Sequence, residues 1–200
     1  MKTIVSIVEG DGEVAALPVL LRRIGEWKVP GEYIDVPRPI RVRRDQFLNR
    51  EEIFSKQLQL AGLKCSEAGD GWILILLDAD DDCPVRLAED ILRRAAIILP
   101  GHKISVVLAN REYEAWFLAA AQSLNGVRGL TITELVAEPD NIRGAKEWLK
   151  LRHSEKRYGE ITDQPALSAA IDLPSAFARS RSFRKLCIEI EKNTSTIDDV

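Results

Sequence analysis

The run Trp72-Ile73-Leu74-Ile75-Leu76-Leu77 leads directly into Asp78-Ala79-Asp80, and the class of fold follows from this junction. Six consecutive apolar residues are typical of a central strand in a parallel sheet that is covered on both faces. Acidic residues just after such a strand lie at the carboxyl edge of the sheet, where open α/β sheets bind their ligands. The junction therefore predicts a buried strand with a ligand site at its end.

A second acidic segment closes the first apolar run of the chain. Thr3 to Val8 is short, β-branched and apolar, which favours a strand, and Glu9-Gly10-Asp11-Gly12-Glu13 follows it. If the two strands are neighbours, their carboxylates point into one crevice, and several carboxylates there cannot all stay ionised without a cation. Hard oxygen ligands favour Mg²⁺ or Mn²⁺, and the scarcity of histidine argues against zinc.

Strand and helix patterns alternate through residue 123, which predicts an α/β domain over 1–123 with a mainly parallel central sheet flanked by helices. A further buried strand is expected over 104–109. Pro37 and Pro39 make 33–42 an edge strand or a loop. Helices are expected over 13–27, 49–63, 84–99 and 112–123, the first becoming regular only just before Pro18 because proline cannot donate to the helical ladder.

The pattern changes after Asn125. Short helices are expected over 133–136, 144–152, 164–171 and 182–192. No long linker precedes them, so we expect 124–200 to form a helical extension packed on the same domain.

Composition narrows the classes of function. The chain has 200 residues, of which 46% are hydrophobic and 30% charged, as in an ordinary globular protein. No apolar stretch approaches the roughly 20 residues that span a bilayer, and no signal peptide precedes the first strand, so we expect a cytoplasmic protein without a membrane partner. A net charge of -3 gives no general attraction to nucleic acid, which would need a local basic surface or a bridging metal ion.

The acidic residues after these two strands have other interpretations. Asp81 and Asp82 precede Pro84, and we expect them to cap the helix that begins there. An EF-hand loop would fit the acids from Asp78 to Glu89, but Cys83 stands where that loop needs glycine and a strand precedes it. A dinucleotide-binding loop at residues 10–12 would need a third glycine, and a haloacid-dehalogenase phosphatase would carry its paired aspartates after the first strand.

Taken in order, Val8-Glu9-Gly10 with Glu13 and Leu77-Asp78-Ala79-Asp80 resemble the Toprim superfamily, the metal-binding domain of topoisomerases, bacterial primases, recombination-repair proteins and OLD-family nucleases. The chain is most similar to a small stand-alone group of uncharacterised bacterial Toprim-like proteins, through residues 110–116 and 180–184. The resemblance implies a Rossmann-like sheet over about the first 120 residues. The metal ligands that it implies are Glu9, Glu13, Asp78, Asp80 and Glu114, of which the first four would also be catalytic. Glu112 is an alternative to Glu114, and a solvated helix face is the plain alternative for both.

These roles imply a Mg²⁺- or Mn²⁺-dependent nuclease in which water attacks the phosphodiester. The tyrosines lie in no topoisomerase-like motif, and no zinc module of the primase type accompanies the chain. Similarity to OLD-like systems implies an effector of bacterial phage defence with an ATPase partner, since no Walker A loop occurs here. The alternative is a non-catalytic metal-binding or regulatory module that binds such an ATPase. The sequence leaves a homodimer open.

The basic residues that would bind nucleic acid come from other parts of the sequence. Arg181 and Arg184 lie in a stretch without acids and are the predicted phosphate contacts. Lys146 and Lys150 are candidates to hold the leaving phosphate, with exposed helix positions as the plain alternative. The arginines from 38 to 50 have acidic neighbours, which favours a solvated charged face.

Overall fold

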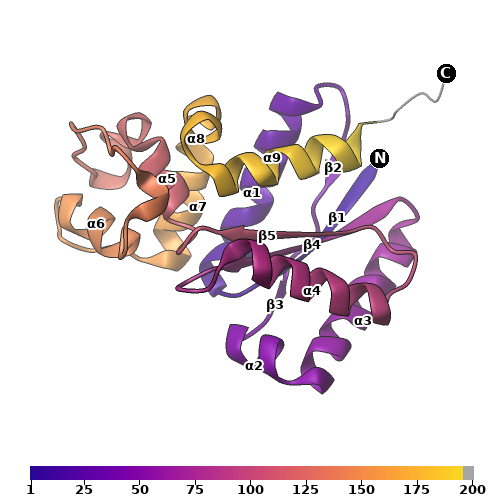
Figure 1. Ribbon diagram of the computed structural model, residues 1–200. Coiled ribbons are helices and arrows are strands. Elements are labelled where there is room, and N and C mark those ends of the chain that lie inside the picture. Colours follow the sequence, from indigo (N-terminus) through magenta and orange to yellow (C-terminus); the bar gives the residue numbers. More distant parts are fainter. Residues whose placement is uncertain (196–200) are drawn as a thin grey trace.

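The computed structural model describes residues 1–195, and within them the chain forms a parallel sheet of five strands (Figure 1). The strands run in the order β2-β1-β4-β5, and β3 also pairs with β1. Their bounds are β1 Lys2–Val8, β2 Ile34–Asp35, β3 Ile40–Arg41, β4 Gly71–Asp78 and β5 Ile104–Ala109. The predicted α/β class and the central position of the apolar run are confirmed.

Helices cover both faces of this sheet, with α1 and α9 on one face and α3 and α4 on the other (Figure 1). Three short 3₁₀ turns lie at Ala121–Leu124, Val127–Gly129 and Pro139–Asn141. The helices are α1 Asp11–Lys28, α2 Arg44–Asn49, α3 Glu51–Ala68, α4 Pro84–Ile98, α5 Ala115–Ala119, α6 Ala145–Arg152, α7 Glu160–Ala170, α8 Leu173–Arg179 and α9 Arg181–Thr194. Within residues 1–195, none of them has the length and apolar character needed to cross a bilayer.

The side chains of β4 explain why its sequence has no polar position. Leu74 and Leu76 belong to the core cluster with α1 and α9, whereas Ile73, Ile75 and Leu77 belong to the cluster with α3 and α4. Successive residues of a strand face opposite sides, so a strand covered on both sides needs apolar residues throughout. At the edge, Pro37 and Pro39 separate β2 from β3, as predicted for the proline-rich segment.

The C-terminal helices share a core with the sheet. Leu167 of α7 and Phe183 of α9 lie in the same buried cluster as Val8 and Leu76. In Figure 1, α5, α6 and α7 lie at the end of the sheet opposite the start of β1, where the strands end. The predicted extension 124–200 is described as far as residue 195, and its last five positions lie outside the described residues.

Several predicted boundaries were wrong. The first helix begins at Asp11 and contains Pro18 in its interior. Pro18 is only partly buried, and the packing of Leu17, Leu20 and Leu21 stabilises the helix around it. The segment 133–136 is not helical, because so short a helix cannot offset its nucleation cost. The helix predicted over 112–123 is divided into α5 and the 3₁₀ turn that follows it, and α8 was not predicted.

We expect Phe183→Ala to destabilise the whole protein by about 3 to 5 kcal/mol, because the side chain is fully buried and packs edge-on against Trp116 with ring centroids 5.5 Å apart. Ile188→Ala on the exposed side of the same helix is the control. Denaturant unfolding followed by circular dichroism and by tryptophan fluorescence should give one shifted transition. Separate transitions for the sheet and for the C-terminal helices would contradict a common core.

Candidate metal centre

The strand order brings the predicted acids to one edge of the sheet. β1 and β4 are parallel neighbours, with Ile7 opposite Ile75, so Glu9 and Asp78 both lie where these strands end. The chain after β5, whose Ala109 pairs with Asp78, leads to Glu114 at the start of α5. The first turn of α1 adds Glu13. Four of the five predicted ligands therefore come from neighbouring strand ends and the turns that follow them.

Gly10 allows Glu13 to fold back over the end of β1. A Cβ atom on Gly10 would lie 2.3 Å from Glu13 Oε2, far inside van der Waals contact. The backbone of Gly10 is extended, with φ of -101°, so its torsion angles do not require glycine. Glycine at this position instead leaves room for the Glu13 carboxylate.

Glu114 is the most enclosed of these acids, with no exposed surface. Its Oε1 accepts hydrogen bonds from the Tyr158 hydroxyl at 2.9 Å and from Gln164 Nε2 at 3.0 Å. Burial raises the pKa of Glu114 to about 7. This carboxylate is therefore held in place by two donors that the C-terminal helical region supplies.

The acids also act on one another. Burial, followed by the charges on Glu114 and Glu13, holds the pKa of Asp78 well above its ordinary value, although Asp78 Oδ1 accepts a hydrogen bond of 2.8 Å from the Tyr113 amide. Burial, followed by the charge on Asp80, raises the pKa of Glu9. Like charges that crowd together in this way favour protonation or a bound cation.

Lys146 is a positive group within this cluster. It pairs with Glu160 at 3.0 Å, and its charge lowers the pKa of Glu9, Asp78 and Glu114. Burial works to lower the pKa of Lys146 itself, but attraction to Glu114 and Glu160 outweighs it and raises that pKa. Lys146 is thus part of the centre, whereas Lys150 pairs with Glu147 on the exposed side of α6.

Unsatisfied oxygen atoms gather at this edge of the sheet. Within residues 1–195, eight buried side-chain nitrogen or oxygen atoms have no hydrogen-bond partner, and four of them belong to this cluster. They are Glu9 Oε2, Glu13 Oε2, Glu114 Oε2 and Gln164 Oε1. Each unsatisfied atom costs about 1 to 3 kcal/mol. Their concentration here indicates a ligand that binds to oxygen atoms. The residues present therefore fit a hard divalent cation.

The carboxylates are neighbours but do not form a finished coordination shell. As the side chains stand, no three His, Cys, Asp or Glu residues in the described part of the chain are arranged to hold a metal ion. Repulsion between like charges keeps the carboxylates apart. Binding of a metal ion would require carboxylates to turn toward that ion.

Arginines hold the acidic turn after β4. The Arg44 side chain is only 12% exposed, donates from Nε to the Asp78 carbonyl at 3.0 Å, and pairs with Asp80 and Asp82. Asp81 pairs with Arg111 and Arg143. The prediction that Asp81 and Asp82 cap α4 was wrong: Cys83 is the N-cap residue, and this helix has no side-chain cap among the described contacts. Both carboxylates are therefore engaged by arginine side chains and do not cap the helix.

The remaining candidates separate into structural and exposed groups. Glu112 Oε2 accepts from the Lys146 amide at 3.2 Å and so caps the start of α6, which leaves Glu114 as the acid of this centre. Arg184 donates from Nε to the Phe177 carbonyl at 3.0 Å and from Nη2 to the Ala178 carbonyl at 2.7 Å, so its guanidinium group holds the end of α8, and its phosphate contact stays a prediction.

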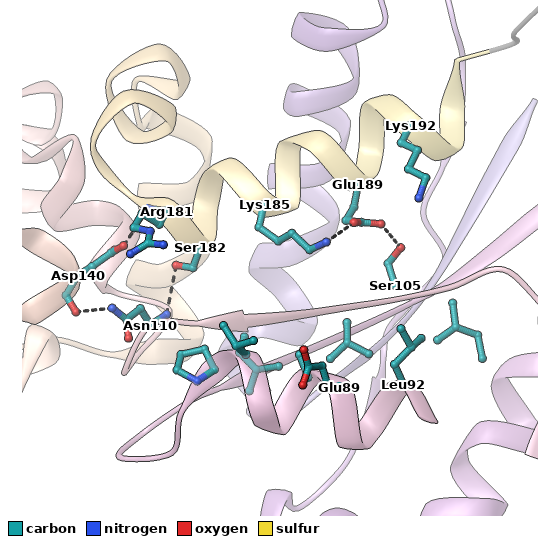
Figure 2. Close-up of a pocket in the computed structure, with 16 residues that line it drawn as sticks. Glu89, Leu92, Ser105, Asn110, Asp140, Arg181, Ser182, Lys185, Glu189 and Lys192 are labelled. Atoms are coloured by element: carbon teal, nitrogen blue, oxygen red, sulfur yellow. Dashed lines mark hydrogen bonds and ion pairs between the residues drawn. The ribbon is translucent and has the colours of Figure 1, made fainter. Parts of the chain in front are cut away.

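Arg181 is exposed and lines a different hollow. This groove of about 720 Å³ runs between α4 and α9 along β5 (Figure 2). Arg181 therefore lies beside the groove and is not part of the carboxylate cluster. The acidic neighbours of Arg44 in the sequence favour a solvated face for this residue. Nothing in the local sequence of Gln164 or Arg143 marks them as site residues.

The raised pKa values predict how the stability of the metal-free protein depends on pH. A carboxyl group whose pKa rises on folding contributes stability that is complete below its unfolded value, 4.5 for Glu114, and is lost as the pH passes about 7. We expect the melting temperature in EDTA to fall by several degrees between about pH 5 and about pH 8, and Glu114→Gln to flatten this dependence. A melting temperature that rises over this range would contradict the cluster.

Comparison with known families gives one match. A family described as "Domain of unknown function (DUF4276)" matches residues 8–191. Neither the curated proteins nor the solved structures give a match. The matched segment contains all the carboxylates of the candidate centre and the C-terminal residues that contact them. The chain belongs to the DUF4276 family, whose domain is of unknown function.

Proposed function

We propose that this protein is a Mg²⁺- or Mn²⁺-dependent phosphodiester hydrolase that cleaves nucleic acid. The observation that carries the proposal is the group of unsatisfied, buried oxygen atoms on Glu9, Glu13 and Glu114 beside Asp78, at the carboxyl edge of a parallel sheet. Ligand sites of open α/β sheets lie at this edge. An arrangement of this kind suits metal-assisted hydrolysis better than a structural ion pair network, because the oxygen atoms lack protein partners within the described residues.

The residues divide the work of such a reaction between them. Glu9, Glu13, Asp78 and Glu114 would hold the cation, with Asp80 reaching in from the exposed turn. The bound cation would supply charge neutralisation at the phosphate and a more acidic water. Lys146 is partly buried among the same carboxylates and would donate to a phosphate oxygen as negative charge develops there.

Two arginines that line a small hollow beside the carboxylates support a phosphate-bearing substrate. A hollow of about 190 Å³ is lined by Asp80, Asp81, Arg111, Glu112, Arg143 and Gly144. Arg111 and Arg143 both pair with Asp81, an exposed carboxylate whose ion pairs are weak and readily replaced by a substrate phosphate. We add these two guanidinium groups to the predicted phosphate contacts.

The backbone beside this 190 Å³ hollow is strained. Asp80 and Arg111 adopt φ of 49° and 65°, and the Asp80 amide donates to the Arg111 carbonyl at 3.0 Å. Left-handed conformations in residues other than glycine cost energy and concentrate at functional sites. The hydrogen bond between these two residues links the acidic turn after β4 to the turn after β5.

A second function has one observation in its favour. The carboxylates do not form a finished shell, which would suit a regulatory module that performs no chemistry. The expectations of an ATPase partner and of a role in phage defence rest on the Toprim resemblance alone.

Cleavage should require the cation and the strand-end acids. We expect the purified protein to cut plasmid, single-stranded DNA or RNA with Mg²⁺ or Mn²⁺, and to be inactive in EDTA. Glu9→Gln and Asp78→Asn should each reduce the rate about 100-fold or more, while Glu52→Gln on the exposed side of α3 should not. Cation binding without cleavage of any of these substrates would favour the regulatory module.

Arg111 and Arg143 should act mainly on substrate binding. We expect Arg111→Ala and Arg143→Ala each to raise KM about 10-fold and to reduce the salt dependence of binding by about one charge, because each would remove one phosphate contact. Arg93→Ala on the exposed surface of α4 is the matched control. Unchanged KM with unchanged salt dependence in both variants would place the substrate elsewhere.

A further inference from the structure

Glu114 accepts its hydrogen bonds from other side chains through one of its two carboxylate oxygens. Both of its hydrogen bonds, from the Tyr158 hydroxyl and from Gln164 Nε2, reach the same oxygen, Oε1. The other oxygen, Oε2, is buried and has no hydrogen bond to any residue from 1 to 195. Two donors on one oxygen fix the rotation of the carboxylate and leave the second oxygen available to a ligand.

The two donors come from a distant part of the chain. Tyr158 and Gln164 lie 44 and 50 residues beyond Glu114, in the loop before α7 and in α7 itself. The α7 helix packs along α1, whose first turn carries Glu13. The C-terminal region thus reaches the carboxylates directly.

Gln164 itself carries an unsatisfied atom. Its side chain is fully buried, and its Oε1 has no partner within the described chain. This oxygen lies over Gly12, where a Cβ atom would come within 2.1 Å of it. Gly12 therefore makes room for the amide one residue before Glu13.

A purely structural role does not account for glutamine at this position. An unpartnered buried amide oxygen costs about 1 to 3 kcal/mol, and a leucine of similar size would avoid that cost against the neighbouring core residue Leu167. The advantage of glutamine is the hydrogen bond to Glu114. Groups that orient a metal ligand through its other atom have this arrangement.

We propose that Gln164 and Tyr158 are positioning residues that clamp Glu114 through Oε1 and direct Oε2 toward the cation, so that the C-terminal helical region completes the metal centre. The inference rests on the proposed function in one respect, because it requires Glu114 to bind a cation. It does not require the protein to cleave anything.

The test measures the affinity for Mn²⁺ by calorimetry, together with the melting temperature of the metal-free protein. We expect Gln164→Leu and Tyr158→Phe each to weaken Mn²⁺ binding about 10-fold or more. The melting temperature of metal-free Gln164→Leu should change by only a few degrees, because loss of the hydrogen bond to Glu114 is offset by removal of the unsatisfied amide oxygen. Ser168→Ala is the matched control: Ser168 is buried on the same helix and bonds to Tyr113, so its loss should lower stability and leave Mn²⁺ affinity intact.

A double-mutant cycle separates positioning from general damage. In a Glu114→Gln background, Gln164→Leu should change Mn²⁺ affinity less than about twofold, because the ligand that it positions is already lost. An equal loss of affinity in both backgrounds, or wild-type affinity in Gln164→Leu, would overturn the inference.

Failure of the inference and failure of the proposed function give different results. If the wild-type protein binds Mn²⁺ without cleaving nucleic acid and Gln164→Leu weakens that binding, the nuclease proposal fails and the positioning role stands. Cleavage and Mn²⁺ binding that are both insensitive to Gln164→Leu would remove only the positioning role. A wild-type protein that binds no Mn²⁺ would overturn both.

Discussion

The parallel pairing of β1 with β4 is the constraint on which the other features depend. With Ile7 opposite Ile75, the two strands end side by side, and Glu9 and Asp78 are forced to the same edge of the sheet. The pairing is stabilised by apolar burial on both faces of β4, a contribution of roughly 25 cal/mol for each Å² removed from water. This core holds together acids that would otherwise separate.

The cost of this crowding is distributed over positive groups of two kinds. Arg44 is largely buried beneath the acidic turn and bonds to its backbone carbonyls as well as to its carboxylates, which makes it part of the fold. Lys146, Arg111 and Arg143 are more exposed and engage one or two acids each, so a phosphate could compete for them. The interior of the cluster thus retains a deficit of positive charge, while its rim carries groups suited to an anion. Both features agree with the proposed substrate, which would bridge a cation and the arginines at the rim.

Sequence patterns were sufficient for the parts of the fold that depend on local periodicity. The unbroken apolar run of β4, the proline-split edge and the α/β alternation follow from burial and backbone chemistry that act over a few residues. The prediction of Pro18 as the start of the regular helix, and of Asp82 as a cap, failed because tertiary contacts outweighed local preference: core packing holds α1 through the proline, and Arg44 engages Asp82. Residues that come together from 44 or more positions apart leave no periodic signal, which is why Gln164 was not found.

The glycines beside the acids link the sequence motif to the site more closely than the motif alone suggests. In Glu9-Gly10-Asp11-Gly12-Glu13, neither Gly10 nor Gly12 is among the residues with positive φ. Each leaves room for a polar side chain: Gly10 for the Glu13 carboxylate, and Gly12 for the Gln164 amide, both so close that a Cβ atom would force the side chain to move. The spacing of the motif therefore reflects how closely oxygen atoms approach the start of α1. Since one of those atoms belongs to α7, the N-terminal motif and the C-terminal helices are parts of a single centre.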